Sequence, residues 1–104
     1  MQRRSARYAK EDWVQIKAQA DANIQGFVEV MRGGEPADSV SAMGLAEEHR
    51  QHLIRWFYDC GADMHRGLGD LYISDERYMA EYDKLEPGFS QYVRDAIHAN
   101  ADRL

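Results

Sequence analysis

Apolar side chains recur every third or fourth residue along this chain, which is the spacing of one face of an α-helix. The clearest stripe, between Lys10 and Met31, consists of Trp13, Ile16, Ala20, Ile24, Phe27 and Met31. A second stripe lies between Phe89 and Asn100. No window of the sequence alternates apolar and polar residues in the way that a half-buried strand does. The pattern therefore predicts an all-α protein with a single five-helix domain.

Residues that stop or cap helices divide this pattern and set the expected helix limits. We expect helices from Lys10 to Met31, from after Asp38 or Ser39 to about Asp59, from just after Cys60 to Ile73, from a Ser74 cap onward, and from about Pro87 onward. The third of these contains Gly61, Gly67 and Gly69, each of which lowers helix propensity by up to ~1 kcal/mol relative to alanine. Such glycines indicate that a helix or a ligand lies close to the backbone there.

Length and charge limit the classes of function. A chain of 104 residues forms one domain, which we place at residues 9–104 after a flexible N-terminal remnant at residues 1–8. A net charge of −5 disfavours direct contact with nucleic acid, despite the cluster of Arg3, Arg4 and Arg7 at the start. One cysteine excludes an internal disulfide, and no apolar run reaches the ~18 residues of a membrane helix. We expect a cytoplasmic protein without membrane contact.

The stretch from His49 to Tyr72 concentrates side chains that a plain helical core does not need. It holds three of the four histidines, the neighbours Trp56 and Phe57, and the one cysteine of the chain, Cys60. The polarity is mixed where a core helix would be uniformly apolar. We interpret this corner as a cleft that the rest of the chain supports.

Cys60 has two interpretations. It precedes a predicted helix N-terminus, where the helix dipole lowers the pKa of a thiol and makes it a better nucleophile. The alternative, which we favour, is a buried cysteine that packs as a small apolar side chain. His65 does not share a helix face with Cys60, and the sequence shows no third member of a catalytic triad. We therefore do not expect an enzyme.

The histidines also have two interpretations. His49 and His52 share a helix face and could be a pair of metal ligands. The string EEHRQH lacks the spacing of the zinc-protease motif, however, and we favour two surface histidines on a solvated helix. His65 is either a polar contact for a ligand or an ordinary helix residue. An alternative function that stays open is a metal- or haem-binding helical sensor that uses His49, His52 or His65. The leading interpretation below needs no cofactor.

An ordered set of short motifs resembles the TipA-type antibiotic-recognition domain of MerR-family transcriptional activators. The resemblance covers nearly the whole chain after Tyr8 and keeps the lengths of the loops. Its motifs are KEDW at Lys10–Trp13, GEPADS at Gly34–Ser39, HRQH at His49–His52, YDCG at Tyr58–Gly61, MH at Met64-His65, LGDLYISDERY at Leu68–Tyr78, PGF at Pro87–Phe89 and YVRDAIHANA at Tyr92–Ala101.

The resemblance implies a globin-like helical fold with a deep surface cleft. It implies a domain that binds thiopeptide antibiotics such as thiostrepton, or related drugs, to sequester them and trigger activation. In the family this domain follows a DNA-binding winged helix and a dimerising coiled coil. DNA contact would then run through an N-terminal domain absent from this chain, and the full-length protein would be a homodimer.

The chain departs from the family pattern in two places. Family domains carry a longer N-terminal segment that orders over the bound drug, so we expect that lid to be partly missing here. Some members trap thiopeptides covalently through a cysteine, and the family can carry a thiol at the positions of Cys60 and Gly67; only the first is a cysteine here. We place the ligand between the second, third and fifth helices, with Cys60 as the candidate nucleophile. The expected ligand-binding residues are Trp56, Tyr58, Cys60, Met64, His65, Leu68 and Tyr72.

Overall fold

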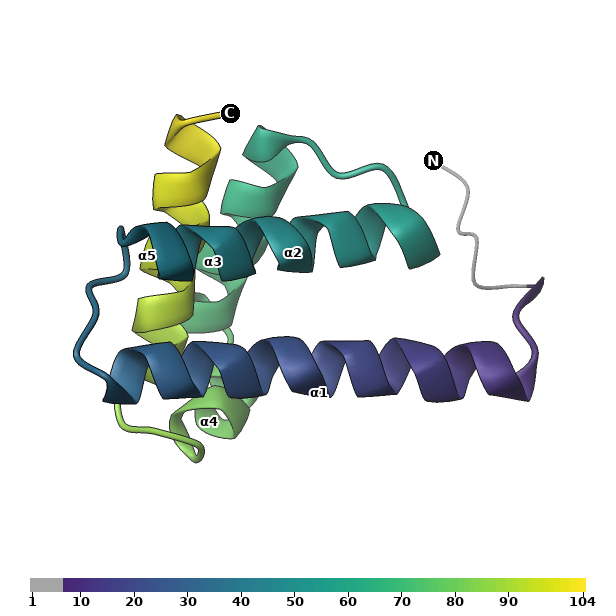
Figure 1. Ribbon diagram of the computed structural model, residues 1–104, viewed down its shortest axis with the longest axis horizontal. Coiled ribbons are helices and arrows are strands. Elements are labelled where there is room, and N and C mark those ends of the chain that lie inside the picture. Colours follow the sequence, from purple (N-terminus) through teal and green to yellow (C-terminus); the bar gives the residue numbers. More distant parts are fainter. Residues whose placement is uncertain (1–6) are drawn as a thin grey trace.

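A computed structural model describes residues 7–104, and these residues form five helices and no strand (Figure 1). The helices are α1 (Lys10–Arg32), α2 (Val40–Trp56), α3 (Ala62–Ser74), α4 (Glu76–Asp83) and α5 (Phe89–Asp102). The prediction of an all-α protein with five helices is confirmed. The expected flexible remnant at residues 1–8 lies largely outside the described residues. Along the described chain, no helix combines the length and the apolar character needed to cross a membrane.

Two helix starts differ from the sequence-based expectation. Ser39 caps α2 as expected, since its Oγ accepts a hydrogen bond from the Ala42 amide at 3.1 Å. Ser74, however, is the last residue of α3, and Asp75 caps α4 instead by accepting a hydrogen bond from the Arg77 amide at 2.9 Å. The last helix starts at Phe89 rather than near Pro87, because Gly88 takes a left-handed conformation with φ of 79°.

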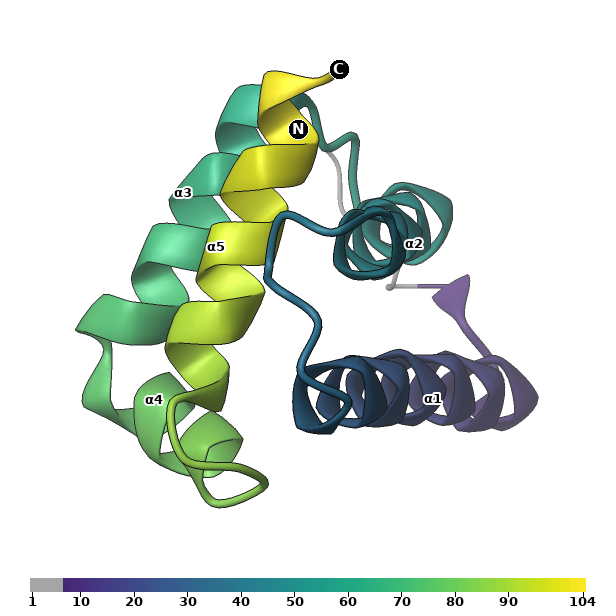
Figure 2. The same cartoon turned by 60° about the vertical axis from the view of Figure 1, so that its left-hand side comes forward.

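The helices form two crossed layers. Figures 1 and 2 show α1 and α2 side by side and antiparallel, across one face of the pair formed by α3 and α5. The short helix α4 closes the end of the second layer where α3 turns back toward α5. The start of α1 and the end of α2 project beyond α3 and α5 (Figure 1).

Helix α5 lies at the centre of the core. It buries Phe89, Val93, Ala96 and Ile97, and this face packs against buried residues of α1, α2 and α3: Phe27, Val28, Ala42, Ala46 and Tyr72. Small alanines on α2 and α5 let the two layers approach closely. The stripe predicted between Phe89 and Asn100 is therefore the main core face of the molecule.

Helices α3 and α5 touch through a glycine. A Cβ atom built on Gly69 would lie 3.4 Å from Ile97 Cγ2 and 3.5 Å from Arg94 Cα. A Cβ atom on Gly67 or Gly61 would meet no described atom within 4 Å. The expectation of a close neighbour is thus confirmed for Gly69 alone of the three, and that neighbour is a helix.

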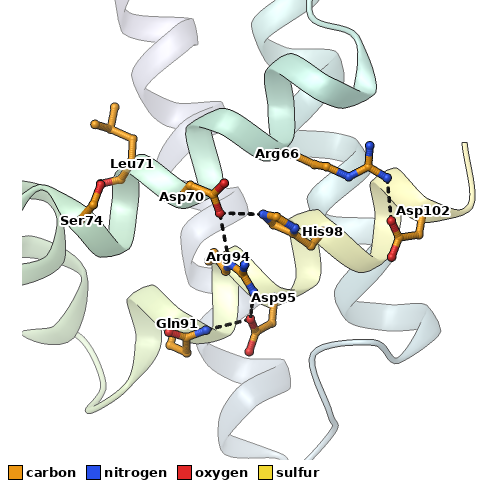
Figure 3. Close-up of polar contacts among 9 residues, drawn as sticks. All are labelled: Arg66, Asp70, Leu71, Ser74, Gln91, Arg94, Asp95, His98 and Asp102. Atoms are coloured by element: carbon orange, nitrogen blue, oxygen red, sulfur yellow. Dashed lines mark hydrogen bonds and ion pairs between the residues drawn. The ribbon is translucent and has the colours of Figure 1, made fainter.

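Charged side chains line the exposed side of the α3 and α5 pair (Figure 3). The Asp70 carboxylate receives hydrogen bonds from Arg94 Nε at 3.2 Å and His98 Nε2 at 2.8 Å. One turn further along, Arg66 donates to Asp102 at 2.6 Å. Exposed ion pairs of this kind contribute roughly 0–1 kcal/mol each, so they align the two helices while the buried faces supply the stability.

A less exposed polar junction joins α2, α5 and the connection that leads into α3. Arg50 donates to both carboxylate oxygens of Glu47, from Nε at 2.9 Å and from Nη2 at 2.7 Å. Its Nη1 donates to the Cys60 carbonyl at 2.8 Å, and Asn100 Nδ2 donates to Glu47 at 3.0 Å. Hydrogen bonds from Arg50, supported by Gln51 and Asn100, lower the pKa of Glu47 to about 2. This carboxylate is therefore charged throughout the physiological range.

The contact at Gly69 gives a direct test of the layer geometry. We expect Gly69→Leu to lower the free energy of unfolding by roughly 1–3 kcal/mol, because the added side chain must push α3 away from α5. Gly67→Leu is the matched control. It should leave stability unchanged or raise it by up to about 1 kcal/mol, since the position is open and leucine favours the helix. Urea denaturation followed by circular dichroism measures both, and equal effects would contradict this packing.

Candidate functional site

A cavity of about 220 Å³ opens between α1 and α2, and we call it the inner cavity. Most of its wall is apolar, and its one residue from the second layer is Tyr82 of α4. Figure 1 shows that the start of α1 and the end of α2, the two helices that supply most of this wall, extend beyond α3 and α5. The lining residues are Ile16, Ala20, Asn23, Ile24, His49, His52, Leu53, Phe57 and Tyr82.

A buried chain of hydrogen bonds lies behind this wall. His49 Nδ1 lies 2.8 Å from His65 Nε2, and Tyr72 Oη lies 3.4 Å from His49 Nε2. His65 Nδ1 is buried and has no hydrogen-bond partner among residues 7–104. A buried N–H without an acceptor is rare, so this nitrogen carries the lone pair and not the proton. His65 Nε2–H then donates to His49, and His49 Nε2–H points toward the tyrosine oxygen.

Burial keeps these imidazoles neutral. Desolvation, together with the nearby His52, lowers the pKa of His49 to about 4. Desolvation also lowers the pKa of His65 to about 3, with His49 and Arg50 acting in the same direction. Because both His49 nitrogens face protein atoms, His49 presents its ring and not a free nitrogen to the cavity.

The expectation of two surface histidines on α2 is wrong. His49 is partly buried in the cavity wall and stacks on His65, with ring centroids 5.1 Å apart. His52 is also partly buried, and its Nε2–H donates to the Ile16 carbonyl of α1 at 3.2 Å. The physical reason is that α1 lies along this face of α2 and shields it from solvent, which the sequence of α2 alone does not reveal.

A second cavity, also of about 220 Å³, lies on the other side of the contact between α1 and α2, and we call it the outer cavity. Asn23 and His52 line both cavities. All of its lining residues have polar or charged side chains, in contrast to the mostly apolar residues of the inner cavity. Its residues are Gln19, Asn23, Glu48, Gln51, His52 and Arg55.

Aromatic rings gather at the projecting end of the first layer. Tyr8 packs edge-on against Trp13 and Trp56, with centroids at 5.7 and 5.3 Å, and its hydroxyl donates to the Trp56 carbonyl. Trp56 Nε1 donates to Gln19 of α1 at 2.8 Å. Phe57 belongs both to this group, 6.2 Å from Trp13, and to the inner cavity. The aromatic cluster thus continues the cavity wall toward the start of α1.

Two of the seven residues expected to bind the ligand support the inner cavity from behind. His65 is fully buried, and Tyr72 is buried in the core, where desolvation raises the pKa of its hydroxyl. Both contact His49, which lines the cavity. They are therefore placed to orient a wall residue.

The other five lie away from both cavities. Trp56 is buried in the aromatic cluster, Tyr58 and Leu68 are partly buried, and Met64 is exposed on α3. Cys60 is 2% exposed, and burial raises the pKa of its thiol although Arg50 opposes the shift. The interpretation of Cys60 as a buried apolar side chain agrees with this environment. Direct contact of the seven residues with a ligand stays a prediction.

The inner cavity contains residues that the sequence did not single out. The sequence indicates Ile16, Ala20 and Ile24 only as members of a core stripe. Asn23 was missed altogether. It follows Ala20 by three residues and precedes Phe27 by four, so it is a polar residue within an apolar stripe. This polar residue within an apolar stripe is the feature of the sequence that could have identified Asn23 as unusual.

The histidines do not form a metal site of the usual kind. Within residues 7–104, no three His, Cys, Asp or Glu side chains are grouped so that they could hold a metal ion. His49 and His65 direct their nitrogens at each other, and His52 directs Nε2 at a carbonyl. The geometry therefore favours a cavity for an organic ligand over the alternative of a metal-binding sensor.

The buried histidines predict a dependence of stability on pH. Their folded-state pKa values lie below the ordinary value of 6.5, so the unfolded chain binds protons that the folded chain does not. The free energy of unfolding is therefore highest above pH 6.5 and decreases as the pH falls toward 4. At pH 4, the protonation of His65 in the unfolded chain alone lowers it by up to about 3 kcal/mol. His65→Gln keeps a hydrogen bond to His49 but does not titrate. We expect its unfolding free energy to vary less between pH 7 and pH 4 than that of the wild type. Urea titrations at each pH check this, and parallel curves would contradict it.

Known proteins share the sequence and the fold of this chain. Residues 1–100 match the TipAS antibiotic-recognition domain family. The chain is 51% identical over 100 residues to the HTH-type transcriptional activator TipA of Streptomyces coelicolor, covering 96% of this chain and 40% of that protein. It therefore spans less than half of the length of this relative.

Two solved structures share the fold. TipAS from the thiopeptide antibiotic multidrug resistance system of Streptomyces lividans, in complex with nosiheptide, superposes with a TM-score of 0.88 at 51% identity over 96% of this chain and 70% of that one. The antibiotic-binding domain of a TipA-class multidrug resistance transcriptional regulator superposes with a TM-score of 0.78 at 51% identity, over 85% of this chain and 94% of the other. With the family match, these likenesses show that the chain belongs to the TipAS antibiotic-recognition domain family.

Proposed function

We propose that this chain is a non-enzymatic drug-binding domain, and that the inner cavity holds a flat heteroaromatic part of a thiopeptide or related antibiotic. The observation that carries the proposal is the wall of that cavity. It is apolar except at Asn23, the two histidines and Tyr82, and both His49 nitrogens face protein atoms. A cavity of this kind binds through apolar contact and ring stacking.

The size of the cavity limits how much of a drug it accepts. Its volume of about 220 Å³ is smaller than the roughly 300–1,000 Å³ of pockets that enclose whole drug-sized ligands. A thiopeptide macrocycle is larger still. One azole or pyridine ring enters the cavity, and the rest of the ligand lies over the aromatic cluster of Tyr8, Trp13, Trp56 and Phe57, where Trp13 is 44% exposed.

The domain acts within a larger regulator. The relative TipA is an HTH-type transcriptional activator, and this chain spans about 40% of its length. We place the chain as the effector-binding part of a cytoplasmic, homodimeric activator of the MerR type, whose DNA contacts come from a different domain. Ligand binding would order the effector domain, sequester the drug and shift the regulator toward its active state.

A substitution that fills the inner cavity tests the location of the site. Ala20→Trp should weaken nosiheptide binding by at least about tenfold, since the indole occupies the space of the ligand ring. Ala18→Trp is the matched control, because Ala18 is exposed on the same helix and does not line the cavity. Binding is measured by isothermal titration calorimetry. As a second readout, a ligand at 100 times its Kd should raise the free energy of unfolding of the wild type by about 2.7 kcal/mol. Equal affinities of the two variants would place the site elsewhere.

The burial of Cys60 predicts non-covalent capture. We expect a mass spectrum of the protein mixed with nosiheptide or thiostrepton to show the complex under native conditions and free protein after denaturation. The reason is that the thiol is buried, has a raised pKa and lies outside both cavities. An adduct that survives denaturation and is lost in Cys60→Ser would contradict this expectation.

A further inference from the structure

Asn23 occupies a special place on α1. It lines both the inner and the outer cavity, yet its side chain is only 4% exposed. It lies on the face of α1 that packs against α2, between the apolar residues Ala20 and Phe27. An apolar side chain would complete this face, so the presence of an amide needs a reason.

Only half of the Asn23 amide is used within the fold. Its Nδ2 donates to the Leu45 carbonyl of α2 at 3.0 Å, and because a carbonyl only accepts, this contact fixes which end of the amide faces α2. The other end, Oδ1, is buried and has no hydrogen-bond partner among residues 7–104. A buried acceptor without a donor lowers stability, and native folds keep few of them.

The bond to Leu45 does not by itself explain the asparagine. Leu45 lies inside α2, and its carbonyl can accept the bond from Nδ2 as well as a helix bond, because a carbonyl oxygen has two lone pairs. This bond satisfies the Nδ2 end of the amide, but Oδ1 stays buried without a donor, which lowers stability. A side chain that is unfavourable in the free protein and lines two cavities is typical of a binding residue.

His52 adds a second acceptor beside Asn23. Its Nε2–H donates to the Ile16 carbonyl, and burial lowers the pKa of the ring, so the neutral form leaves Nδ1 as an acceptor. The two residues that the cavities share thus both offer acceptors. The complementary group on a ligand is a hydrogen-bond donor.

We propose that Asn23 is a specificity-determining residue that accepts a hydrogen bond from an N–H of the ligand, and that it selects ligands whose aromatic rings are joined by secondary amides. This inference rests on the proposed function and adds the chemistry that the inner cavity recognises. Because Oδ1 is covered in the free protein, the side chains around it shift when the donor enters the inner cavity. Ligands with an ester or ether in place of the amide bind less tightly.

Asn23→Leu separates recognition from structure, because the two roles predict opposite results. If Asn23 recognises the ligand, the variant should melt at the same or a higher temperature than the wild type, since an unpaired buried acceptor is removed. Its affinity for nosiheptide should fall by about tenfold, the effect of one lost hydrogen bond. Gln25→Leu is the matched control, because Gln25 is an exposed amide on the same helix that lines neither cavity. It should bind as the wild type does.

Carbon-13 NMR gives a direct readout of the same contact. The side-chain carbonyl of Asn23, assigned by its absence in Asn23→Leu, should move downfield when nosiheptide is added, whereas that of Gln25 should not. An Asn23→Leu affinity within twofold of the wild type, or an unmoved Asn23 carbonyl in the bound protein, overturns the inference and leaves the proposed function standing. A parallel loss of stability and affinity in Asn23→Leu also overturns it. Failure of the wild type to bind nosiheptide overturns both.

Discussion

The pair formed by Arg50 and Glu47 is the interaction on which the site depends most. The guanidinium group of Arg50 donates hydrogen bonds to the Glu47 carboxylate and also to the Cys60 carbonyl. The second contact fixes the connection between α2 and α3, and so sets where α3 begins. His65 lies only one turn into α3, and His49 precedes Arg50 directly on α2. The hydrogen bond between the two histidines, and with it the inner wall of the cavity, requires this junction to be in place.

Local sequence signals predicted the helices well, because their causes are local. The stripe from Trp13 to Met31, the Ser39 cap and the paired Gly33-Gly34 each act within a few residues, and α1 and α2 begin where these signals place them. The errors at Ser74 and Pro87 are also local. Ser74 and Asp75 are adjacent residues that can both cap a helix, and the structure uses Asp75. The last helix begins later than predicted because Gly88 adopts a left-handed conformation.

The cavities were not predictable in the same way, because they arise from how far one layer projects past the other. Trp13 belongs to the predicted apolar face of α1 but is 44% exposed, since α1 extends beyond the helices that would cover it (Figure 1). From the sequence of α2 alone, His49 and His52 are expected on the surface. In the structure, α1 packs along α2 and partly buries both. The inner cavity overlaps the predicted cleft near His49–Tyr72 through His49, His52 and Phe57. The prediction assigned the lining to α3, whereas α1 supplies the opposite wall.

Helix α4 gives the cavity an adaptable edge. None of its residues is buried, yet Tyr82 reaches from it into the cavity wall and packs on Tyr72 and Phe89, with ring centroids at 5.0 and 5.7 Å. A helix held by so little buried surface opens locally at a far smaller free energy than the core does. The edge of the cavity at Tyr82 is therefore free to move while α5 stays fixed behind it. The width of the cavity is adjustable because stability is unevenly distributed within one small domain.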